Sequence, residues 1–162
     1  MSIEAEKLFF ESRLKNDEGE VGIAAVLLHD IVARYPNFGK AYALLGTIYF
    51  KSFDDPILAE TFFKKAIALS PDYYITYLDY AALLLSQERY TEQVAVLNKG
   101  LETTGVNKDK AWYYLGLMHE RQKQFEEAIE NFQKALFYSV IDTEIAFYQQ
   151  AIERCLMKRR LG

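Results

Sequence analysis

The sequence has very little cysteine, histidine, proline or glycine. Among its 162 residues there are one cysteine, two histidines, three prolines and eight glycines. The single cysteine, Cys155, cannot form a disulfide within the chain, and it leaves no Cys-based or His-rich metal site with His29 and His119. So few prolines and glycines, beside 51% hydrophobic residues, exclude a low-complexity or disordered chain. We therefore expect a folded protein that needs no disulfide, metal or cofactor.

Long apolar runs and an excess of basic residues are also missing. No apolar stretch approaches the roughly 20 residues of a membrane-spanning helix, and the acidic start Met1–Glu6 is unlike a signal peptide. The formal net charge is -4, and the basic run 158–160 is too short for the broad patch that nucleic-acid binding requires. These features predict one cytoplasmic domain over residues 1–162 that neither crosses a membrane nor binds nucleic acid.

The motifs that carry enzyme chemistry are absent as well. His119 and Glu120 begin a zinc-protease helix motif, but Lys123 stands where the second histidine is needed. The glycines do not gather into a phosphate-binding loop, and no Gly-x-Ser-x-Gly elbow occurs. Nothing near Cys155 in sequence indicates the base that a cysteine nucleophile needs. We expect no catalytic activity, and we expect His119 and Cys155 to be packed core residues.

What the sequence does contain is an internal repeat. A large aromatic residue is followed three positions later by Leu-Gly at Tyr42 and at Trp112, and Tyr77 keeps the pattern with Tyr80-Ala81 instead. These three anchors lie 35 positions apart, twice in succession. A second motif of small and large residues follows each anchor, at Ala59, Phe63 and Ala66, then Gln93, Leu97 and Gly100, then Ala128, Phe132 and Ala135. A fixed period of this length is typical of repeat architectures.

The pattern resembles the tetratricopeptide repeat, a 34-residue helix pair with Trp, Leu-Gly and Tyr in its first helix and Ala, Phe, Ala and Pro in or after its second. Three repeats cover residues 39–73, 74–108 and 109–142. A degenerate one covers 5–38, with Leu8 and Ser12 where the family has Trp and Gly. The resemblance implies an all-α fold, a right-handed superhelical solenoid of antiparallel helix pairs. Residues 143–160 would then form a capping helix.

The residues themselves predict the same helices. Apolar periodicity and helix-end signals indicate about nine, at 3–15, 20–34, 38–51, 56–69, 73–86, 90–103, 108–122, 125–138 and 143–159. Asp55 before Pro56 is typical of a helix start, and Asp142 is a candidate N-cap for the last helix. Helix packing explains the glycines at positions 46 and 116, because Gly46 and Gly116 each let a neighbouring helix approach closely.

In the family, the first helices of successive repeats line a concave groove that binds peptides or partner helices. The resemblance places the following residues in this groove: Lys40, Leu44, Thr47, Phe50, Tyr74, Leu78, Asp79, Lys110, Tyr113, Tyr114, Leu117 and Phe147. Most are apolar or aromatic, which suits an amphipathic helix or an extended segment with apolar anchors. We expect a non-catalytic adaptor that binds a segment of a partner protein.

Some family members hold the C-terminal carboxylate of heat-shock chaperones with Lys, Asn, Asn, Lys and Arg at fixed positions. Here Lys110 alone matches, because the other positions carry Ala43, Thr47, Asp79 and Tyr114. We also expect Asp79 to repel a carboxylate. The sequence therefore argues against chaperone tails as partners.

Two other functions fit the sequence. Residues 1–20 carry six acids and three bases, whereas residues 143–162 carry two acids and four bases. Opposite ends could therefore attract in a head-to-tail oligomer, or the last helix could form a homodimer. Small size and acidic charge also fit a secretion chaperone built from such repeats, although that is analogy of fold and bulk properties alone.

Overall fold

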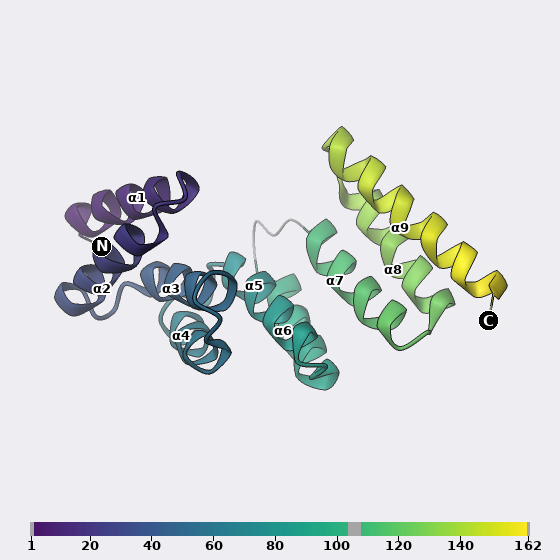
Figure 1. The fold of residues 1–162 in the computed structure, drawn as a ribbon, viewed down its shortest axis with the longest axis horizontal. Helices are drawn as coiled ribbons and strands as arrows, with labels where there is room; N and C mark the ends of the chain where they lie inside the picture. Colours follow the sequence, from purple (N-terminus) through teal and green to yellow (C-terminus); the bar gives the residue numbers. More distant parts are fainter. Residues whose placement is uncertain (1, 104–107, 162) are drawn as a thin grey trace. The chain divides into compact units, whose positions relative to one another are not determined.

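A computed structural model describes residues 2–103 and 108–161. Over these residues the chain is all-α, with nine helices and no strand (Figure 1). The helices are α1 (Ile3–Asp17), α2 (Val21–Arg34), α3 (Gly39–Lys51), α4 (Pro56–Leu69), α5 (Ile75–Ser86), α6 (Tyr90–Glu102), α7 (Lys108–Arg121), α8 (Phe125–Tyr138) and α9 (Asp142–Leu161). Each expected helix is confirmed, and each expected end lies within two residues of the observed one.

The helix ends follow from local chemistry. The Asp55 side chain accepts a hydrogen bond from the Leu58 N–H at 3.0 Å, and Pro56 begins α4, as expected. Asp142 is itself the first residue of α9, so its assignment as the N-cap is wrong by one position. The turns inside the helix pairs each use one residue with a positive φ, at Gly19, Asp54, Glu88 and Lys123. A left-handed residue lets the chain reverse in very few positions.

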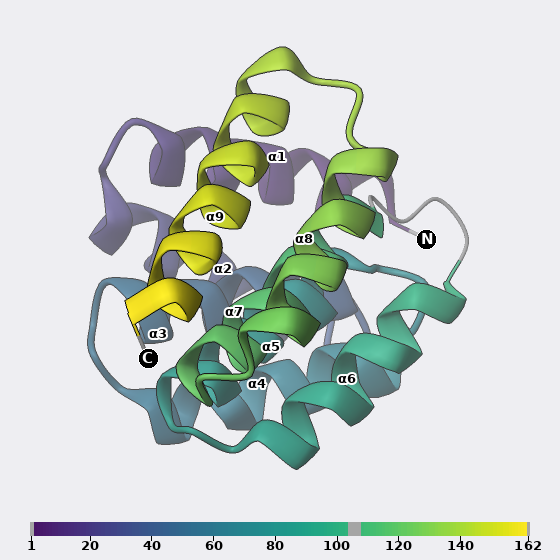
Figure 2. The ribbon, with the colours of Figure 1, turned by 90° about the vertical axis from the view of Figure 1, so that its right-hand side faces the viewer.

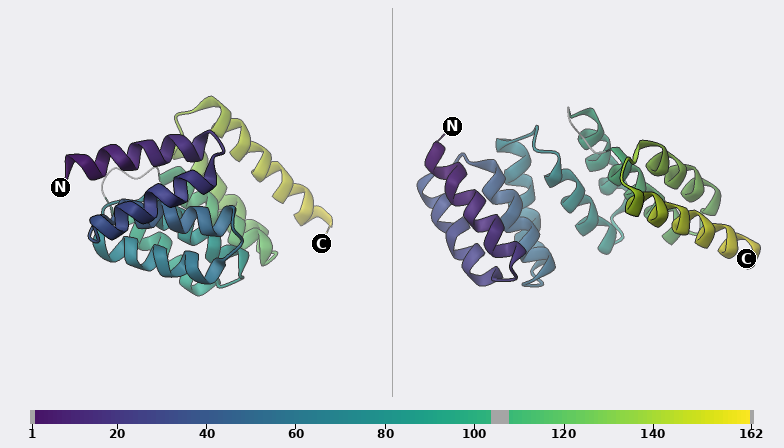
Figure 3. Two further views of the ribbon diagram at one scale, coloured as in Figure 1. Left: turned by 60° about the vertical axis from the view of Figure 1, so that its left-hand side comes forward. Right: turned by 90° about the horizontal axis from the view of Figure 1, so that it is seen from above.

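The chain divides into two compact units, Met1–Leu83 and Leu84–Gly162, with the boundary inside α5. In the amino-terminal unit, α1 packs on α2, α2 on α3, and α3 on α4 (Figure 3). In the carboxy-terminal unit, α6 packs on α7, α7 on α8, and α8 on α9; Figure 2 shows α8 and α9 side by side. None of the helices in the described stretches is long and apolar enough to span a bilayer.

The core of the amino-terminal unit is built from small and large apolar residues that meet between helices. Its main cluster contains Ala5, Phe9, Ala24, Ala25, Leu28, Ile31, Phe38, Ala41, Leu45 and Ile48. The expected close approach at Gly46 is confirmed, because a Cβ there would lie 2.6 Å from the Phe63 ring. Phe63 is fully buried and stacks on Tyr80 with the ring centroids 5.7 Å apart.

The core of the carboxy-terminal unit lies under α9. It contains Ala128, Ile129, Phe132, Ala151 and Cys155, and a Cβ at Gly116 would lie 2.5 Å from the Phe132 ring. Cys155 is fully buried, as expected, and burial raises the pKa of its thiol to about 11. His119 is half-buried rather than a full core residue, with its Nδ1 2.8 Å from the Gln124 side-chain oxygen.

Polar pairs that involve buried carboxylates attach α9 to α7. Arg154 donates two hydrogen bonds of 2.7 Å to the Glu120 carboxylate, and Lys158 donates a third of 2.8 Å. Burial acts to raise the pKa of Glu120, but these cationic donors outweigh it and lower the pKa to about 2. At the other end of α9, the Tyr148 hydroxyl donates to the Asp109 carboxylate at 3.0 Å. Both of these residues are buried.

Candidate partner-binding site

In the amino-terminal unit, residues of α1, α3, α5 and the turn before α5 line a small cavity of about 120 Å³. We call it the α1–α3–α5 cavity, and its lining consists of Phe9, Arg13, Ala43, Leu44, Thr47, Tyr73, Ile75 and Asp79. Leu44, Thr47 and Asp79 were expected at the binding groove, and the structure brings them together here. Phe50, Tyr74 and Leu78 were expected beside them; they are half-buried but do not line this cavity.

Both carboxylate oxygens of Asp79 already have partners. The Thr47 hydroxyl donates to one oxygen at 2.7 Å, and the Lys51 ammonium donates to the other at 2.9 Å. The Asp79 side chain is only 16% exposed. We expected Asp79 to repel a bound carboxylate, but that expectation assumed an unpaired charge. With Lys51 beside it, the charge of Asp79 is compensated.

Arg13 lines the cavity although it was not among the residues expected at the groove. Its side chain is exposed, and it forms no hydrogen bond or ion pair with any residue in the described part of the chain. Burial raises the pKa of the neighbouring Tyr73 hydroxyl, and the charge of Arg13 opposes that rise. Lys40, which was expected at the groove, is paired instead with Glu6 at 2.8 Å. Arg13 therefore brings an uncompensated positive charge to the cavity.

Arg13 could have been found from the repeat register. Thr47 and Leu117 directly follow the glycines of the repeat motif, Gly46 and Gly116, and both were assigned to the groove. Ser12 replaces this glycine in the degenerate first repeat, so Arg13 occupies the same register position. The assignment of the groove began with the second repeat and therefore missed it.

The groove residues expected in the carboxy-terminal unit gather around Tyr113. Its ring centroid lies 5.1 Å from that of Phe147 and 5.8 Å from that of Tyr114. It also contacts the buried rings of Phe132 and Tyr148 at 5.7 and 5.6 Å, so Tyr113 is largely a packing residue. Phe147 remains 48% exposed at the edge of this cluster.

The other two expected residues of this unit are engaged within it. Leu117 packs against the core cluster under α9, and Lys110 lies 3.4 Å from the Glu144 carboxylate. Glu120 lies on the same helix as these two residues and is buried, with its carboxylate held by Arg154 and Lys158. The pairing with α9 therefore uses the Glu120 carboxylate.

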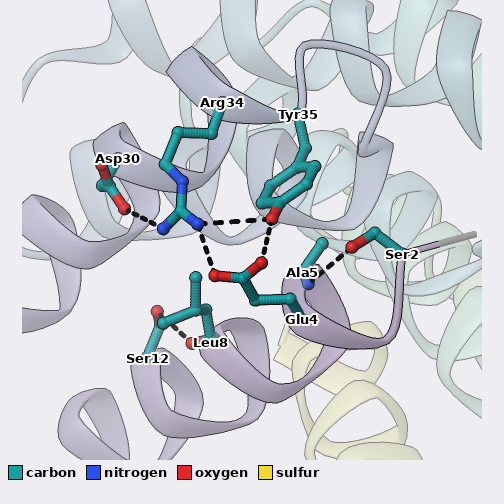
Figure 4. Close-up of polar contacts among 8 residues, drawn as sticks. All are labelled: Ser2, Glu4, Ala5, Leu8, Ser12, Asp30, Arg34 and Tyr35. Atoms are coloured by element: carbon teal, nitrogen blue, oxygen red, sulfur yellow. Dashed lines mark hydrogen bonds and ion pairs between the residues drawn. The ribbon is translucent and has the colours of Figure 1, made fainter.

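A second polar cluster, beside α1, joins that helix to the end of α2 (Figure 4). The Tyr35 hydroxyl donates to the Glu4 carboxylate at 2.7 Å, and Arg34 pairs with both Glu4 and Asp30. Hydrogen bonds from Tyr35 and Arg34 lower the pKa of Glu4. All of these charges are internally paired, so the cluster positions two helices and offers no unpaired group to a ligand.

Nothing in the described stretches resembles a metal centre. No group of three or more His, Cys, Asp or Glu side chains lies close enough there to hold an ion. In the described residues each unit therefore presents a surface of apolar and aromatic side chains, and Arg13 adds an unpaired cation to that of the amino-terminal unit.

Two stretches of the chain, residues 39–73 and 109–137, match models of the tetratricopeptide repeat. The fold is similar to PilF of Pseudomonas aeruginosa, with a TM-score of 0.84 and 22% identity over 96% of this chain and 69% of that one. TTC0263, a thermophilic TPR protein of Thermus thermophilus, has a TM-score of 0.76 and 19% identity, over 91% of this chain and 81% of that one. YrrB, described as a TPR protein with an unusual peptide-binding site, has a TM-score of 0.70 and 16% identity, over 90% of this chain and 74% of that one. No curated protein matches the sequence.

Proposed function

Since this chain belongs to the tetratricopeptide-repeat family, whose members typically bind proteins and are non-catalytic, we propose that it is an adaptor that holds a segment of a partner protein. Each unit offers a surface for such a segment: the α1–α3–α5 cavity in the first, and the aromatic cluster around Phe147 in the second. The observation that carries the proposal is the cavity itself, which is lined by apolar side chains and by the unpaired cation of Arg13. This combination suits an amphipathic helix or an extended peptide.

The aromatic cluster supports the same proposal. Exposed aromatic rings on a rigid helical surface supply contact area at low cost in side-chain entropy. Phe147 is half exposed, and its ring is held by Tyr113 and Tyr148 at centroid distances of 5.1 and 5.9 Å. A partner side chain can therefore contact Phe147 without ordering it first. The peptide-binding site named for YrrB adds a precedent within this fold.

Site-specific photo-crosslinking tests where the partner binds. Phe147 is replaced by a photoreactive phenylalanine, the tagged protein is irradiated in native lysate, and adducts are identified by mass spectrometry. We expect a discrete protein adduct at this position, because the replacement keeps the aromatic ring at the proposed surface. The matched control places the same amino acid at Phe137, which is 81% exposed on α8 and lies outside the proposed surface.

Crosslinking at the two positions distinguishes the proposed binding surface from the rest of the carboxy-terminal unit. An adduct at Phe147 that is absent at Phe137 supports the proposal. The same adduct at Phe137 alone contradicts it, since the second helices would then be the working surface. Equal labelling of many proteins at both positions also contradicts a specific site.

Self-association is the second candidate, and α1 supplies the observation that favours it. Ile3, Phe10 and Leu14 are 87%, 70% and 48% exposed, and their spacing of seven and four residues places them on one face of the helix. An exposed apolar helix face of this kind is typical of an interaction surface. The opposite net charges of the chain's two ends favour a head-to-tail arrangement over a symmetric one.

Sedimentation velocity over a hundredfold range of concentration tests this candidate. If α1 mediates association, the wild-type protein is expected to gain mass with concentration, and Phe10→Ser is expected to remain a monomer. The control is Phe53→Ser, which removes a 43%-exposed ring outside α1. A wild-type protein that stays monomeric throughout, or loss of association in both variants, contradicts the assignment to α1.

A further inference from the structure

The charges around the α1–α3–α5 cavity do not cancel. Lys40 is paired with Glu6, and Lys51 is paired with Asp79. Arg13 has no such partner in the part of the chain that the structure describes. Among these five charged groups one positive charge is therefore in excess, and it belongs to a side chain that lines the cavity. A guanidinium in this state is complementary to a carboxylate, which it can bind through two parallel hydrogen bonds.

The rest of the lining suits a carboxylate on a short apolar stem. Phe9, Ala43, Leu44 and Ile75 supply apolar walls, and the volume of about 120 Å³ is enough for one side chain of moderate size. Tyr73 offers a second donor, because its hydroxyl hydrogen-bonds to no described residue while its ring packs into the core beside Tyr42. Asp79 does not oppose an anion strongly, since Lys51 compensates its charge at 2.9 Å.

We propose that the α1–α3–α5 cavity binds the side-chain carboxylate of an Asp or Glu in the partner segment, next to an apolar residue, with Arg13 as its ion-pair partner. The Tyr73 hydroxyl donates a further hydrogen bond to the same carboxylate. This inference rests on the proposed function and names the chemistry of the partner. It concerns one internal acidic residue rather than a C-terminal carboxylate, because Arg13 is the only unpaired cation in the described cavity lining.

Selection of peptides tests the partner chemistry without knowledge of the natural partner. A displayed library of random peptides is panned against the wild-type chain, Arg13→Gln, Arg13→Glu and Lys7→Gln. Lys7 is the matched control, an exposed cation on α1 that does not line the cavity. The highest-affinity wild-type peptide is then synthesised with both ends blocked, alongside its Glu→Gln or Asp→Asn version. Fluorescence anisotropy gives each dissociation constant.

We expect wild type and Lys7→Gln to enrich an acidic residue beside an apolar one. Arg13→Gln should weaken the blocked acidic peptide about tenfold, as loss of one charge-assisted pair predicts. The amide version of the peptide should bind wild type and Arg13→Gln equally. Arg13→Glu should select basic residues in place of acidic ones. Because Arg13 is exposed and makes no hydrogen bond or ion pair with a described residue, these variants are expected to keep the wild-type circular dichroism spectrum.

The outcomes separate this inference from the proposed function. If wild type enriches no peptide, the proposed function fails and this inference fails with it. If wild type enriches peptides that lack an acidic residue, or if Arg13→Gln binds the acidic peptide as tightly as wild type, the cavity assignment alone is overturned. Binding that requires an unblocked peptide C-terminus overturns it as well, since the carboxylate would then be terminal.

Discussion

Glu120→Ala is expected to lower the free energy of unfolding of the carboxy-terminal unit by about 3 kcal/mol at pH 7. The Glu120 side chain is 7% exposed and accepts three hydrogen bonds from Arg154 and Lys158, which hold α9 against α7. Removing it breaks all three bonds and leaves a small void in the packing. The loss stays at the lower end of the range for buried pairs, because the two cationic side chains are 42% and 49% exposed and regain water.

Urea unfolding followed by tryptophan fluorescence measures this loss. Trp112 is the only tryptophan of the sequence and lies on α7, so its emission reports on the affected unit. The matched control is Glu126→Ala, an exposed acid on α8 that lies 3.6 Å from Arg159. Its expected effect is below about 1 kcal/mol, as for exposed ion pairs in general. Equal effects of the two substitutions would show that burial of the Glu120 pair adds nothing.

The same carboxylate makes stability depend on pH. Its pKa falls from 4.5 to about 2 on folding. A lowered pKa means that the stabilisation is complete above about pH 4.5 and disappears as the pH falls toward 2. Glu120→Gln cannot lose a proton, so the difference in unfolding free energy between it and wild type should shrink by more than half between pH 7 and pH 3. A difference that stays constant over this range contradicts the assignment.

Gly116→Ala is expected to destabilise the protein by about 2 kcal/mol, although alanine is the better helix former. A Cβ at this position lies 2.5 Å from Cε1 and 2.6 Å from Cδ1 of Phe132, whose fully buried ring has no solvent to move into. The cost of overpacking exceeds the gain of about 1 kcal/mol in helix propensity. Gly22→Ala is the matched control, because nothing lies within 4 Å of the added Cβ in helix α2.

The two glycine substitutions should therefore change stability in opposite directions. Gly22→Ala is expected to stabilise the protein by about 0.5 kcal/mol, since only the propensity term remains. Thermal unfolding by circular dichroism, with both variants in one buffer, compares them directly. A stabilising Gly116→Ala would mean that the Phe132 ring relaxes freely, and the close contact between α7 and α8 would not be required.

The helices were predictable because their signals are local. Apolar spacing, Pro56 after Asp55, and the Leu-Gly motifs act within one or two turns, so the expected bounds agree closely with the observed ones. The last helix is an instructive case, since it extends to Leu161 and two residues beyond the expected end. Its lysine and arginine residues continue the helix because basic side chains are favourable in a last turn.

The candidate site was less predictable, because it depends on pairs that are distant in sequence. The register placed Leu44, Thr47 and Asp79 at the cavity, but it could not show that Lys51 compensates Asp79 across 28 residues. Nor could it show that Glu120 pairs with Arg154, 34 residues away. Which of several nearby charges pair depends on side-chain packing between helices, and spacing along one helix carries no information about it.

Because Cys155 is buried, the reactivity of its thiol reports local opening of the structure around it. The thiol is fully buried among residues of α8 and α9, and its pKa is raised to about 11, so the closed form offers an alkylating reagent almost no thiolate. Only molecules in which α9 has lifted away can react. The rate at which the reagent labels Cys155 in native buffer therefore measures how often α9 opens while the rest of the protein stays folded.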